Sequence, residues 1–311
     1  MTRLTENKII LITRSTRLEE LVARYNTPDQ ARFYVEHLGA SFSDYEIEHR
    51  NYKTALQDTE MQLRALGRVQ VLDRNFLTNF IFGKEDTVIV LGQDGLVANT
   101  LKYLHEQPII AVNPDPLRWE GVLLPFGVND VGKIVIDVFA QRRSVREITM
   151  AKATLTNGQM LYGVNDLFIG PRSHVSARYQ ISIGDRKEQQ SSSGIIVSTG
   201  LGSTGWFRSI LAGARGIGSA FGNPLNTDML KTFRWESNYL YYTVREPFPS
   251  KSSAANLVFG KVDTKAPLNL ISQMPENGVI FSDGIEADYL EFNSGMQAVI
   301  SVAEKKGHLV V

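Results

Sequence analysis

The strongest constraint on the fold of this chain is a change of pattern near residue 145. Before it, short β-branched apolar runs such as Lys8–Thr13 and Thr87–Leu91 alternate with stretches whose apolar residues recur at helical spacing. Strands that alternate with helices form parallel sheets covered on both faces. Residues 1–145 therefore predict an α/β domain with a parallel sheet, and 311 residues leave room for a second domain.

After residue 145 the apolar segments are short and bounded by turn-forming residues. They are Thr149–Thr156, Leu161–Ile169, Tyr179–Ile183, Gly194–Ser198, Tyr239–Val244, Leu257–Phe259, Leu268–Ile271, Gly278–Ser282 and Ala298–Val302. This pattern is typical of an antiparallel sandwich. Residues 146–311 thus predict a β-sandwich-like domain whose C-terminal segment can return to the first domain, with Gly184–Ser193 as a hairpin loop. The cleft between the two domains is the expected ligand site.

Composition excludes several classes of protein. Lys+Arg and Asp+Glu are both 33, so the chain lacks the basic excess of a nucleic-acid-binding protein. It has no cysteine, which excludes disulfides, thiolate nucleophiles and cysteine-ligated metals. No apolar stretch approaches the roughly 18–20 residues that span a bilayer, and the N-terminus lacks the features of a secretory signal. We therefore expect a cytoplasmic protein with no nucleic-acid or membrane partner.

The first segment that suggests chemistry is Val88–Gly95. A buried strand ends in Gly92-Gln93-Asp94-Gly95, and a helical pattern with Leu101 and Leu104 on one side follows. Glycines let a backbone approach a phosphate closely, and a helix N-terminus offers free N–H groups to an anion. A carboxylate at the carboxyl end of a parallel strand points to the place where open α/β sheets bind ligands. The alternative is an ordinary tight turn in which Asp94 caps the helix.

Two further segments lie in the predicted β domain. Ser198–Trp206 follows a strand and has three glycines with hydroxyl residues between them, which suits phosphate oxygens, although it lacks the ending of a nucleotide P-loop. Its alternative is a flexible surface loop, and Gly213, Gly216, Gly218 and Gly222 continue the glycine-rich stretch. Asn165-Asp166 is a polar pair within an apolar run, suited to adenine edges and ribose hydroxyls. Taken by itself, the pair is better explained as closing a β-turn.

Other candidates are weaker. The five histidines show no metal-ligand spacing, and the first strand is followed by Arg14-Ser15-Thr16-Arg17 and not by the glycine-rich fingerprint of a dinucleotide-binding dehydrogenase. We expect Arg14 and Arg17 at the surface near a helix start, with a phosphate contact as the alternative.

Taken together, the three segments resemble the NAD kinase family and, more distantly, the diacylglycerol and sphingoid-base kinases. That family has a Gly-Gly-Asp-Gly motif, then an Asn-Glu pair, then a Thr-Pro-Thr-Gly-Ser-Thr-Ala-Tyr-like stretch. Gly92–Gly95, Asn165-Asp166 and Thr199–Trp206 occupy these places in the same order. Ser282-Asp283-Gly284 is similar to the family's C-terminal Asp-Gly.

The resemblance implies an ATP-dependent kinase that phosphorylates the 2′-hydroxyl of NAD. Asp94 would act on the acceptor hydroxyl as general base or through Mg²⁺, which the substrate phosphates would mainly hold, with Asp94 as a candidate protein ligand. Nucleotide and substrate binding would involve Gly92, Gln93, Gly95, Asn165, Asp166, Thr199, Gly202, Ser203 and Thr204. The resemblance also implies a homodimer or homotetramer.

The chain departs from the family pattern at several positions. Gln93 replaces a glycine, Asp166 is one methylene shorter than a glutamate, and Gly200-Leu201 replaces Pro-Thr. Ser193 stands where the family usually has an acidic residue. These differences leave two alternatives open: a related kinase with a lipid or sugar alcohol as acceptor, or a catalytically weak NAD(P)-binding sensor. The sequence leaves the phosphoryl donor and the choice between NAD and NADH open.

Overall fold

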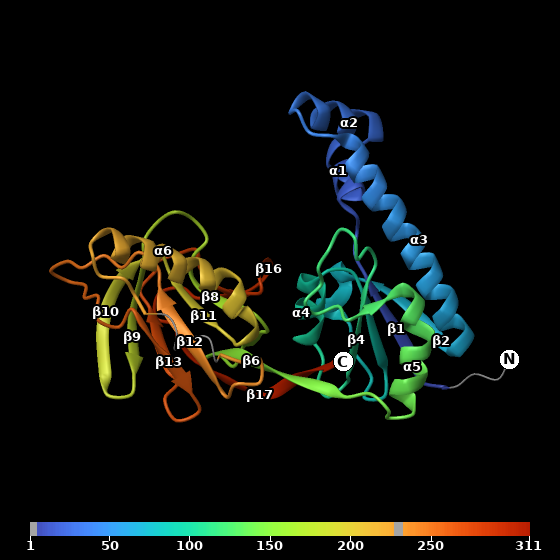
Figure 1. The fold of residues 1–311 in the computed structure, drawn as a ribbon. Coiled ribbons are helices and arrows are strands. Elements are labelled where there is room, and N and C mark those ends of the chain that lie inside the picture. The colour runs from blue at the N-terminus through green and yellow to red at the C-terminus, as the bar shows by residue number, and fades with distance from the viewer. Residues whose placement is uncertain (1–4, 227–232) are drawn as a thin grey trace. The chain divides into compact units, whose positions relative to one another are not determined.

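A computed structural model describes residues 5–226 and 233–311 of the chain. These residues form two compact units (Figure 1). Unit 1 comprises Met1–Arg146 and His308–Val311, and unit 2 comprises Glu147–Gly307. Two long strands, β6 (Val145–Leu155) and β17 (Gln297–Val310), carry the chain across the boundary between the units.

Unit 1 contains a parallel sheet. The strand order is β5 (Phe126–Gly127), β4 (Ile109–Asn113), β3 (Thr87–Leu91), β1 (Lys8–Thr13) and β2 (Arg68–Asp73). The end of β17 also pairs in parallel with β4, through Leu309 and Ile109. Every residue of β3 and β4 is buried, which explains why these strands read as continuous apolar runs. The predicted α/β domain with a parallel sheet is confirmed.

The strand order of unit 1 reverses at β1. The chain passes from β1 through three helices to β2 on one side, whereas β3 pairs with the other side of β1. In open α/β sheets ligands bind outside the carboxyl ends of the strands at such a reversal. The ends of β1 and β3 therefore mark the edge of unit 1 at which a ligand is expected.

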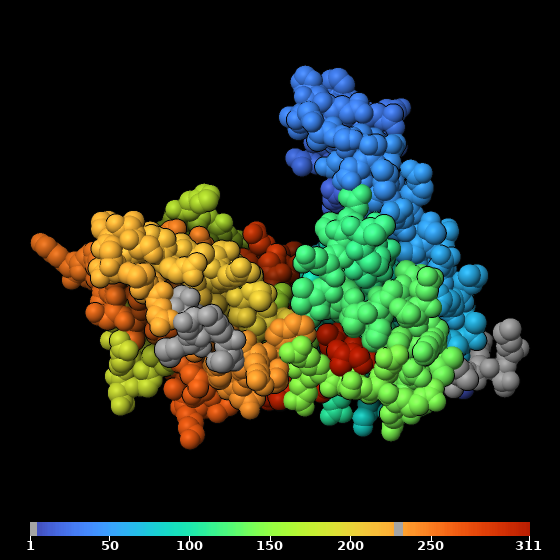
Figure 2. Space-filling view, in the orientation of Figure 1, coloured from blue at the N-terminus to red at the C-terminus, as the bar shows by residue number. Residues whose placement is uncertain are grey.

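The helices of unit 1 are α1 (Arg17–Tyr25), α2 (Pro28–His37), α3 (Phe42–Leu66), α4 (Asp94–Leu101) and α5 (Val131–Phe139), with a 3₁₀ turn at Arg74–Asn79. Figures 1 and 2 show α1 and α2 at one end of the long helix α3. The helix predicted after Asp94 is present as α4, but its apolar residues are not confined to one side, because Leu96–Leu101 are all buried. No helix in the described part of the chain is long and apolar enough to cross a membrane.

Unit 2 is built from two mainly antiparallel sheets. One contains β10 (Arg186–Ser192), β9 (Ala177–Ile183), β14 (Leu268–Ser272) and β17, with β6 and β7 (Met160–Gly163) continuing beyond β17. The other contains β13 (Phe259–Asp263), β12 (Tyr239–Val244), β11 (Ile195–Ser198), β8 (Asp166–Pro171), β15 (Gly278–Ser282) and β16 (Ile285–Glu291) in that order. Alternate side chains from both sheets, such as Leu270 and Leu167, form one core, and the predicted sandwich-like domain is confirmed.

The structure corrects several boundaries in unit 2. The predicted strand Leu161–Ile169 is two strands, β7 and β8, which belong to different sheets. The predicted hairpin loop Gly184–Ser193 is mostly strand β10, which pairs with β9 along its length. The glycine-rich stretch after Trp206 is a helix, α6 (Trp206–Ala220), that packs over one face of the second sheet.

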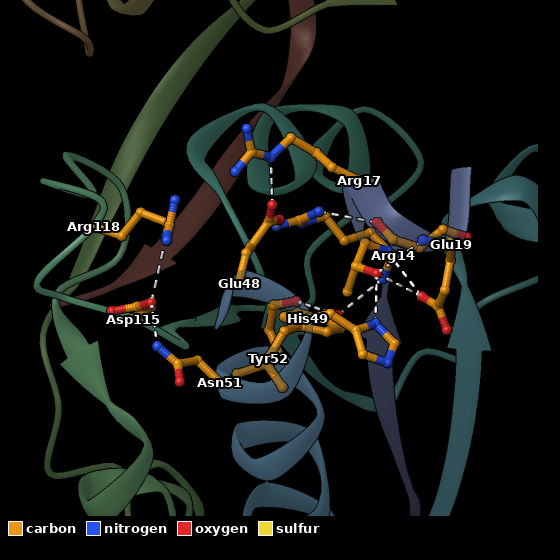
Figure 3. Close-up of polar contacts among 12 residues, drawn as sticks. Arg14, Arg17, Glu19, Glu48, His49, Asn51, Tyr52, Asp115 and Arg118 are labelled. Atoms are coloured by element: carbon orange, nitrogen blue, oxygen red, sulfur yellow. Dashed lines mark hydrogen bonds and ion pairs between the residues drawn. The ribbon is translucent and has the colours of Figure 1, made fainter. Parts of the chain in front are cut away.

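A polar cluster joins α3 to the carboxyl ends of β1 and β3 (Figure 3). The Tyr52 hydroxyl accepts a hydrogen bond from the Arg14 backbone N–H over 3.0 Å and donates to the Leu91 carbonyl over 3.1 Å. Burial raises the pKa of Tyr52 to about 12, so the hydroxyl keeps its proton. The tyrosine thus ties together the strand ends at which the strand order reverses.

An ion-pair cluster lies beside this tyrosine (Figure 3). Arg14 donates to Glu48 over 2.9 Å, Arg17 donates to the other oxygen of the same carboxylate, and Glu48 is only 2% exposed. Burial alone would raise the pKa of Glu48, but hydrogen bonds and charges from Arg14 and Arg17 outweigh it and hold this pKa below its ordinary value. Arg17 begins α1 as predicted, whereas Arg14 is buried and not at the surface.

Removal of Glu48 should therefore destabilise unit 1 strongly. Replacement of this residue by alanine leaves the Arg14 guanidinium buried without its carboxylate, which typically costs about 3–5 kcal/mol. Glu46→Ala is a matched control, because Glu46 pairs with Arg32 at the surface and such pairs contribute about 0–1 kcal/mol. Urea unfolding of both variants measures the difference. Equal midpoints for the two variants would contradict this account of Glu48.

Candidate functional site

The turn after β3 is held tightly against the sheet. The Gly92 N–H donates to the Val112 carbonyl of β4 over 3.2 Å. A Cβ at Gly92 would lie 2.8 Å from a Leu96 methyl group, so a side chain here would require the end of Leu96 to move. Gln93 is the N-cap of α4, and its carbonyl accepts the first helical hydrogen bonds. Asp94 is therefore the first residue of the helix and not its cap.

Asp94 uses its carboxylate to hold a neighbouring loop. One oxygen accepts the Leu123 N–H over 2.8 Å, and the other accepts the Val122 N–H over 3.1 Å. A carboxylate offers about four acceptor positions, so about two remain for a hydroxyl or a cation. Asp94 also lines a pocket of about 360 Å³ together with Gln93 and Arg118.

Arg118 is a site residue that the sequence analysis did not identify. It lies in the loop that Asp94 holds, and its guanidinium pairs with Asp44 over 2.8 Å. It also pairs more loosely with Asp115 over 3.7 Å (Figure 3). It places a positive charge on the wall of the Asp94 pocket. No regular spacing links Arg118 to Asp94 or Asp44 in the sequence, so only the fold brings these charges together.

In unit 2, the Asn165-Asp166 pair lies at the break between β7 and β8. The carboxylate of Asp283, in the turn after β15, accepts the backbone N–H groups of Val164, Asn165 and Asp166, and the shortest of these bonds is 2.6 Å to Asn165. In return, the Asp283 N–H donates to the Asp166 carbonyl over 3.1 Å. Asp283 adopts a left-handed backbone with φ 55° and Gly284 follows with φ 72°, and this tight turn aims the carboxylate at the break.

Asp166 is an acceptor without a donor. Its side chain is 7% exposed, and among residues 5–226 and 233–311 no group donates a hydrogen bond to its carboxylate. Burial, reinforced by the nearby charge of Asp283, raises the pKa of Asp166 to about 7. Its oxygens are not among the fully buried side-chain atoms that lack a partner, so they are open to water or to a ligand. A ligand hydroxyl would supply the missing donor.

The glycine-hydroxyl loop packs directly on this pair. The Thr199 N–H donates to the Asn165 carbonyl over 2.9 Å, and the Thr199 hydroxyl donates to the Val164 carbonyl over 2.5 Å. A Cβ at Gly202 would lie 1.9 Å from the Asn165 carbonyl oxygen, so only glycine allows this close approach. Thr199 and Gly202 thus join the loop to the Asn165-Asp166 segment, and the flexible-loop alternative does not describe these residues.

The remaining residues of this loop differ in exposure. Ser203 is half-buried, and its hydroxyl donates to the Gly200 carbonyl over 2.7 Å. Thr204 is exposed, and within the described part of the chain its hydroxyl has no partner. Thr199 is fully buried. Of the three hydroxyls predicted to contact a nucleotide, that of Thr204 is therefore the most accessible.

Unit 2 has a pocket beside α6, on the outer face of β8 and β11. It has a volume of about 540 Å³ and is lined by Phe168, Trp206, Phe281, Ser193 and Arg245, among others. The rings of Phe168 and Trp206 stack with centroids 5.8 Å apart, and Arg245 lies 5.2 Å from the Trp206 ring centroid. Ser193, one of the departures noted in the sequence, faces this pocket.

The structure thus brings together the predicted residues of each unit. Gly92, Gln93, Asp94 and Gly95 form one turn in unit 1, whereas Asn165, Asp166, Thr199, Gly202, Ser203 and Thr204 form one group of contacts in unit 2. The described residues contain no group of three or more His, Cys, Asp or Glu side chains placed to hold a metal ion.

Comparison with solved structures identifies the fold of this chain. No protein-family model matches the chain. In overall fold, the chain is similar to the crystal structure of an NAD kinase from Archaeoglobus fulgidus in complex with ATP (TM-score 0.55, 14% identity, 98% of this chain and 93% of that one). It is also similar to yeast NADH kinase complexed with NADH (TM-score 0.55, 13% identity, 99% of this chain and 84% of that one).

Sequence similarity points to the same family. The chain is 25% identical to human NAD kinase 2, mitochondrial, over 321 aligned residues that cover 81% of this chain and 72% of the human protein. The resemblance predicted from Gly92–Gly95, Asn165-Asp166 and Thr199–Trp206 is confirmed. The chain is a divergent relative of the NAD kinases and has their fold.

The raised pKa of Asp166 makes a prediction about stability. The unfolded chain ionises this carboxyl near pH 4, whereas the folded chain retains the proton up to about pH 7. Below pH 4 both states are protonated, so Asp166 costs no stability there. As the pH rises from 4 to 7, ionisation of Asp166 in the unfolded chain lowers the free energy of unfolding. Above pH 7 this decrease in stability is complete.

The variant Asp166→Asn has no carboxyl at this position, so its stability should not decrease in this way as the pH rises. Without ligand, its free energy of unfolding relative to the wild type should rise by roughly 2–3 kcal/mol between pH 5 and pH 7.5. Urea unfolding at four pH values measures this difference, with Asp185→Asn, an exposed carboxylate at a hairpin turn, as the control. Parallel pH profiles for the wild type and Asp166→Asn would contradict the assignment.

Proposed function

We propose that this protein is an ATP-dependent kinase that transfers a phosphoryl group to the 2′-hydroxyl of NAD and so produces NADP. The similarity to the NAD kinases supports a kinase of this family. The neighbours in fold were crystallised with ATP and with NADH, which supports ATP as the donor and a nicotinamide dinucleotide as the acceptor.

The observation that carries the proposal is the state of Asp166. This carboxylate is buried, has no donor among the described residues and lies beside the half-buried amide of Asn165. In our proposal a ribose hydroxyl donates to Asp166, and the Asn165 amide, which offers both a donor and an acceptor, contacts the adenosine. The Asp283 carboxylate and Thr199 act through the backbone, because they fix the position of these two residues.

Asp94 would act on the acceptor hydroxyl. In the proposed step, the hydroxyl oxygen attacks the γ-phosphorus of ATP, the bond to the bridging oxygen of ADP breaks, and the hydroxyl proton passes to the Asp94 carboxylate or to water. Two backbone N–H groups hold this carboxylate in place while leaving it acceptor positions. Phosphoryl transfer depends mainly on such positioning and on neutralisation of charge. Arg118 lines the same pocket, where its guanidinium pairs with Asp44 and Asp115.

The residues fit a magnesium ion that substrate phosphates hold. Mg²⁺ commonly binds one or two carboxylates together with phosphates and water, and Asp94 is one carboxylate with free acceptor positions. When bound, the ion neutralises charge on the phosphates. Asp94 would then serve as its protein ligand.

The pocket beside Trp206 is a candidate for the other end of the dinucleotide. Stacked aromatic rings and a guanidinium suit a planar ring and a phosphate. Ser193 faces the same pocket in place of an acidic residue. If the acceptor differs from NAD, we expect the difference to originate here or at Gln93 in the Asp94 pocket.

The kinase activity can be tested directly. Purified protein with Mg²⁺, ATP and NAD should form NADP, detected with an NADP-specific dehydrogenase, and a parallel reaction with NADH shows which dinucleotide is preferred. Asp94→Asn should lower kcat by about 10²–10⁴-fold, the usual contribution of a general acid or base. Asp58→Asn, an exposed carboxylate on α3, should retain wild-type activity.

Two results would count against the proposal. Full activity in Asp94→Asn would remove Asp94 from the chemical step. A folded protein that binds nucleotide but forms neither NADP nor NADPH would exclude NAD and NADH as acceptors, and would favour the sensor or a kinase with another alcohol as acceptor.

A further inference from the structure

Helix α6 has a second pocket on a different face from the one beside Trp206. Trp206 and Ile210 turn toward the sheet and pack near Phe168, whereas Arg208, Leu211 and Arg215 recur every three or four residues on another side of the helix. This second side lines a pocket of about 510 Å³, which is within the usual size of a small-molecule site. Figure 2 shows atoms of α6 at the surface of unit 2.

The pocket is positively charged. Arg208 and Arg215 are both exposed and both line it. Among residues 5–226 and 233–311, neither guanidinium has an ion-pair, hydrogen-bond or ring partner. Other arginines of unit 2 do have partners: Arg172 lies 3.8 Å from the Tyr289 ring centroid, and Arg245 lies over Trp206. The described lining contains no Asp or Glu, so no described residue of the pocket balances the two charges.

The spacing of the two arginines suits a ligand with several phosphates. Seven residues are almost two full helical turns, so both side chains leave the same side of α6 about 10 Å apart along its axis. A guanidinium binds phosphate oxygens with two parallel hydrogen bonds. Two such groups at this separation can hold different phosphates of one chain, whereas a single small anion would engage only one of them.

The rest of the pocket offers a surface for a planar ring. Trp235 is half-buried, and its carbonyl accepts the Thr149 N–H over 2.8 Å, which fixes this segment to β6. Phe233 stacks on Tyr239 with ring centroids 5.2 Å apart. The backbone here is also pressed against the glycine-hydroxyl loop, since a Cβ at Gly200 would lie 1.8 Å from the Arg234 carbonyl oxygen. Aromatic side chains that are held in place are good stacking partners for bases.

We propose that this pocket binds a nucleoside polyphosphate, with its phosphates on Arg208 and Arg215 and its base against Trp235. The exposed Thr204 hydroxyl at the start of the helix adds a donor for the phosphate chain. This inference does not depend on the proposed kinase activity, because binding can be measured without turnover. The same chemistry could serve the phosphoryl donor or a nucleotide that binds separately.

Calorimetric titration with ATP and Mg²⁺ tests the site. Arg208→Gln and Arg215→Gln should each weaken ATP binding about tenfold, because a charge-assisted hydrogen bond contributes at least about 1.5 kcal/mol. The double variant should weaken binding further and should reduce its dependence on salt. Arg178→Gln, which removes an exposed arginine of β9, is the control for the change in charge and should bind ATP as the wild type does.

Further readouts identify the ligand and guard against misfolding. Inorganic tripolyphosphate should compete with ATP, adenosine should compete weakly, and both effects should depend on the pocket residues. If the site holds the donor, the double variant also raises the KM for ATP in the kinase assay. If it holds a separate nucleotide, the double variant loses one of two ATP equivalents and keeps its KM. Either result supports the site.

One pattern of results overturns the proposal. If the double variant melts at the wild-type temperature, binds ATP with an unchanged Kd and stoichiometry and keeps its KM, the pocket is not a nucleotide site. Wild-type protein that binds no ATP at millimolar concentration would have the same consequence. Loss of binding in Arg178→Gln equal to that in the pocket variants would reduce the effect to net charge, and would also overturn the proposal.

Discussion

The Asp283 carboxylate is the interaction on which the candidate site of unit 2 depends. It lies 118 residues from Asn165 in the sequence, yet it accepts consecutive backbone N–H groups at the break between β7 and β8. These groups would otherwise lack partners, because the two strands leave for different sheets at this point. The same negative charge adds to burial in raising the pKa of Asp166. One side chain therefore positions its neighbour and adds to the effect of burial on that neighbour's pKa.

In unit 1, the Asp94 carboxylate has a role similar to that of Asp283. Its carboxylate also accepts backbone N–H groups from a loop distant in sequence, and it thereby positions the loop that carries Arg118. Beside it, the buried pair of Arg14 and Glu48 closes the end of β1. Buried ion pairs add little net stability relative to apolar packing. Their value here is positional, because they hold α3 and the strand ends together where a ligand is expected.

The two faces of α6 show how one helix can serve two sites. Its small residues Gly213, Gly216 and Gly218 are exposed or half-buried, while Phe207 is buried and stacks on Tyr241 and Phe259. Phe207 thus anchors the start of the helix to the sheet, and the residues on either side of it face different pockets. The aromatic contacts at this anchor fix the direction of the Arg208 and Trp206 side chains.

The sequence predicted the fold best where local patterns were strong. Fully buried strands such as Thr87–Leu91 appear as uninterrupted apolar runs, and the glycine at position 202 marks a close backbone contact that the structure contains. It failed where burial involved polar residues or glycine. Helix α3 was not predicted, because its buried face includes Glu48 and Thr59, and α6 was missed because glycines lower helix propensity. The hairpin strand β10 was missed because its sequence is polar.

The sequence by itself determined the α/β and β domains and the order of the three motifs, and it identified Asp94, Asn165 and Asp166 as candidate site residues. Each depends on residue type or on spacing within one segment. Only the tertiary structure decided which groups these residues meet. The contact of Asp283 with Asn165, the loop held by Asp94 and the pairing of Arg14 with Glu48 all depend on segments distant in the chain. Hydrogen bonding and charge compensation act between groups that are close in space, so a local sequence pattern does not reveal a partner that is distant in the chain.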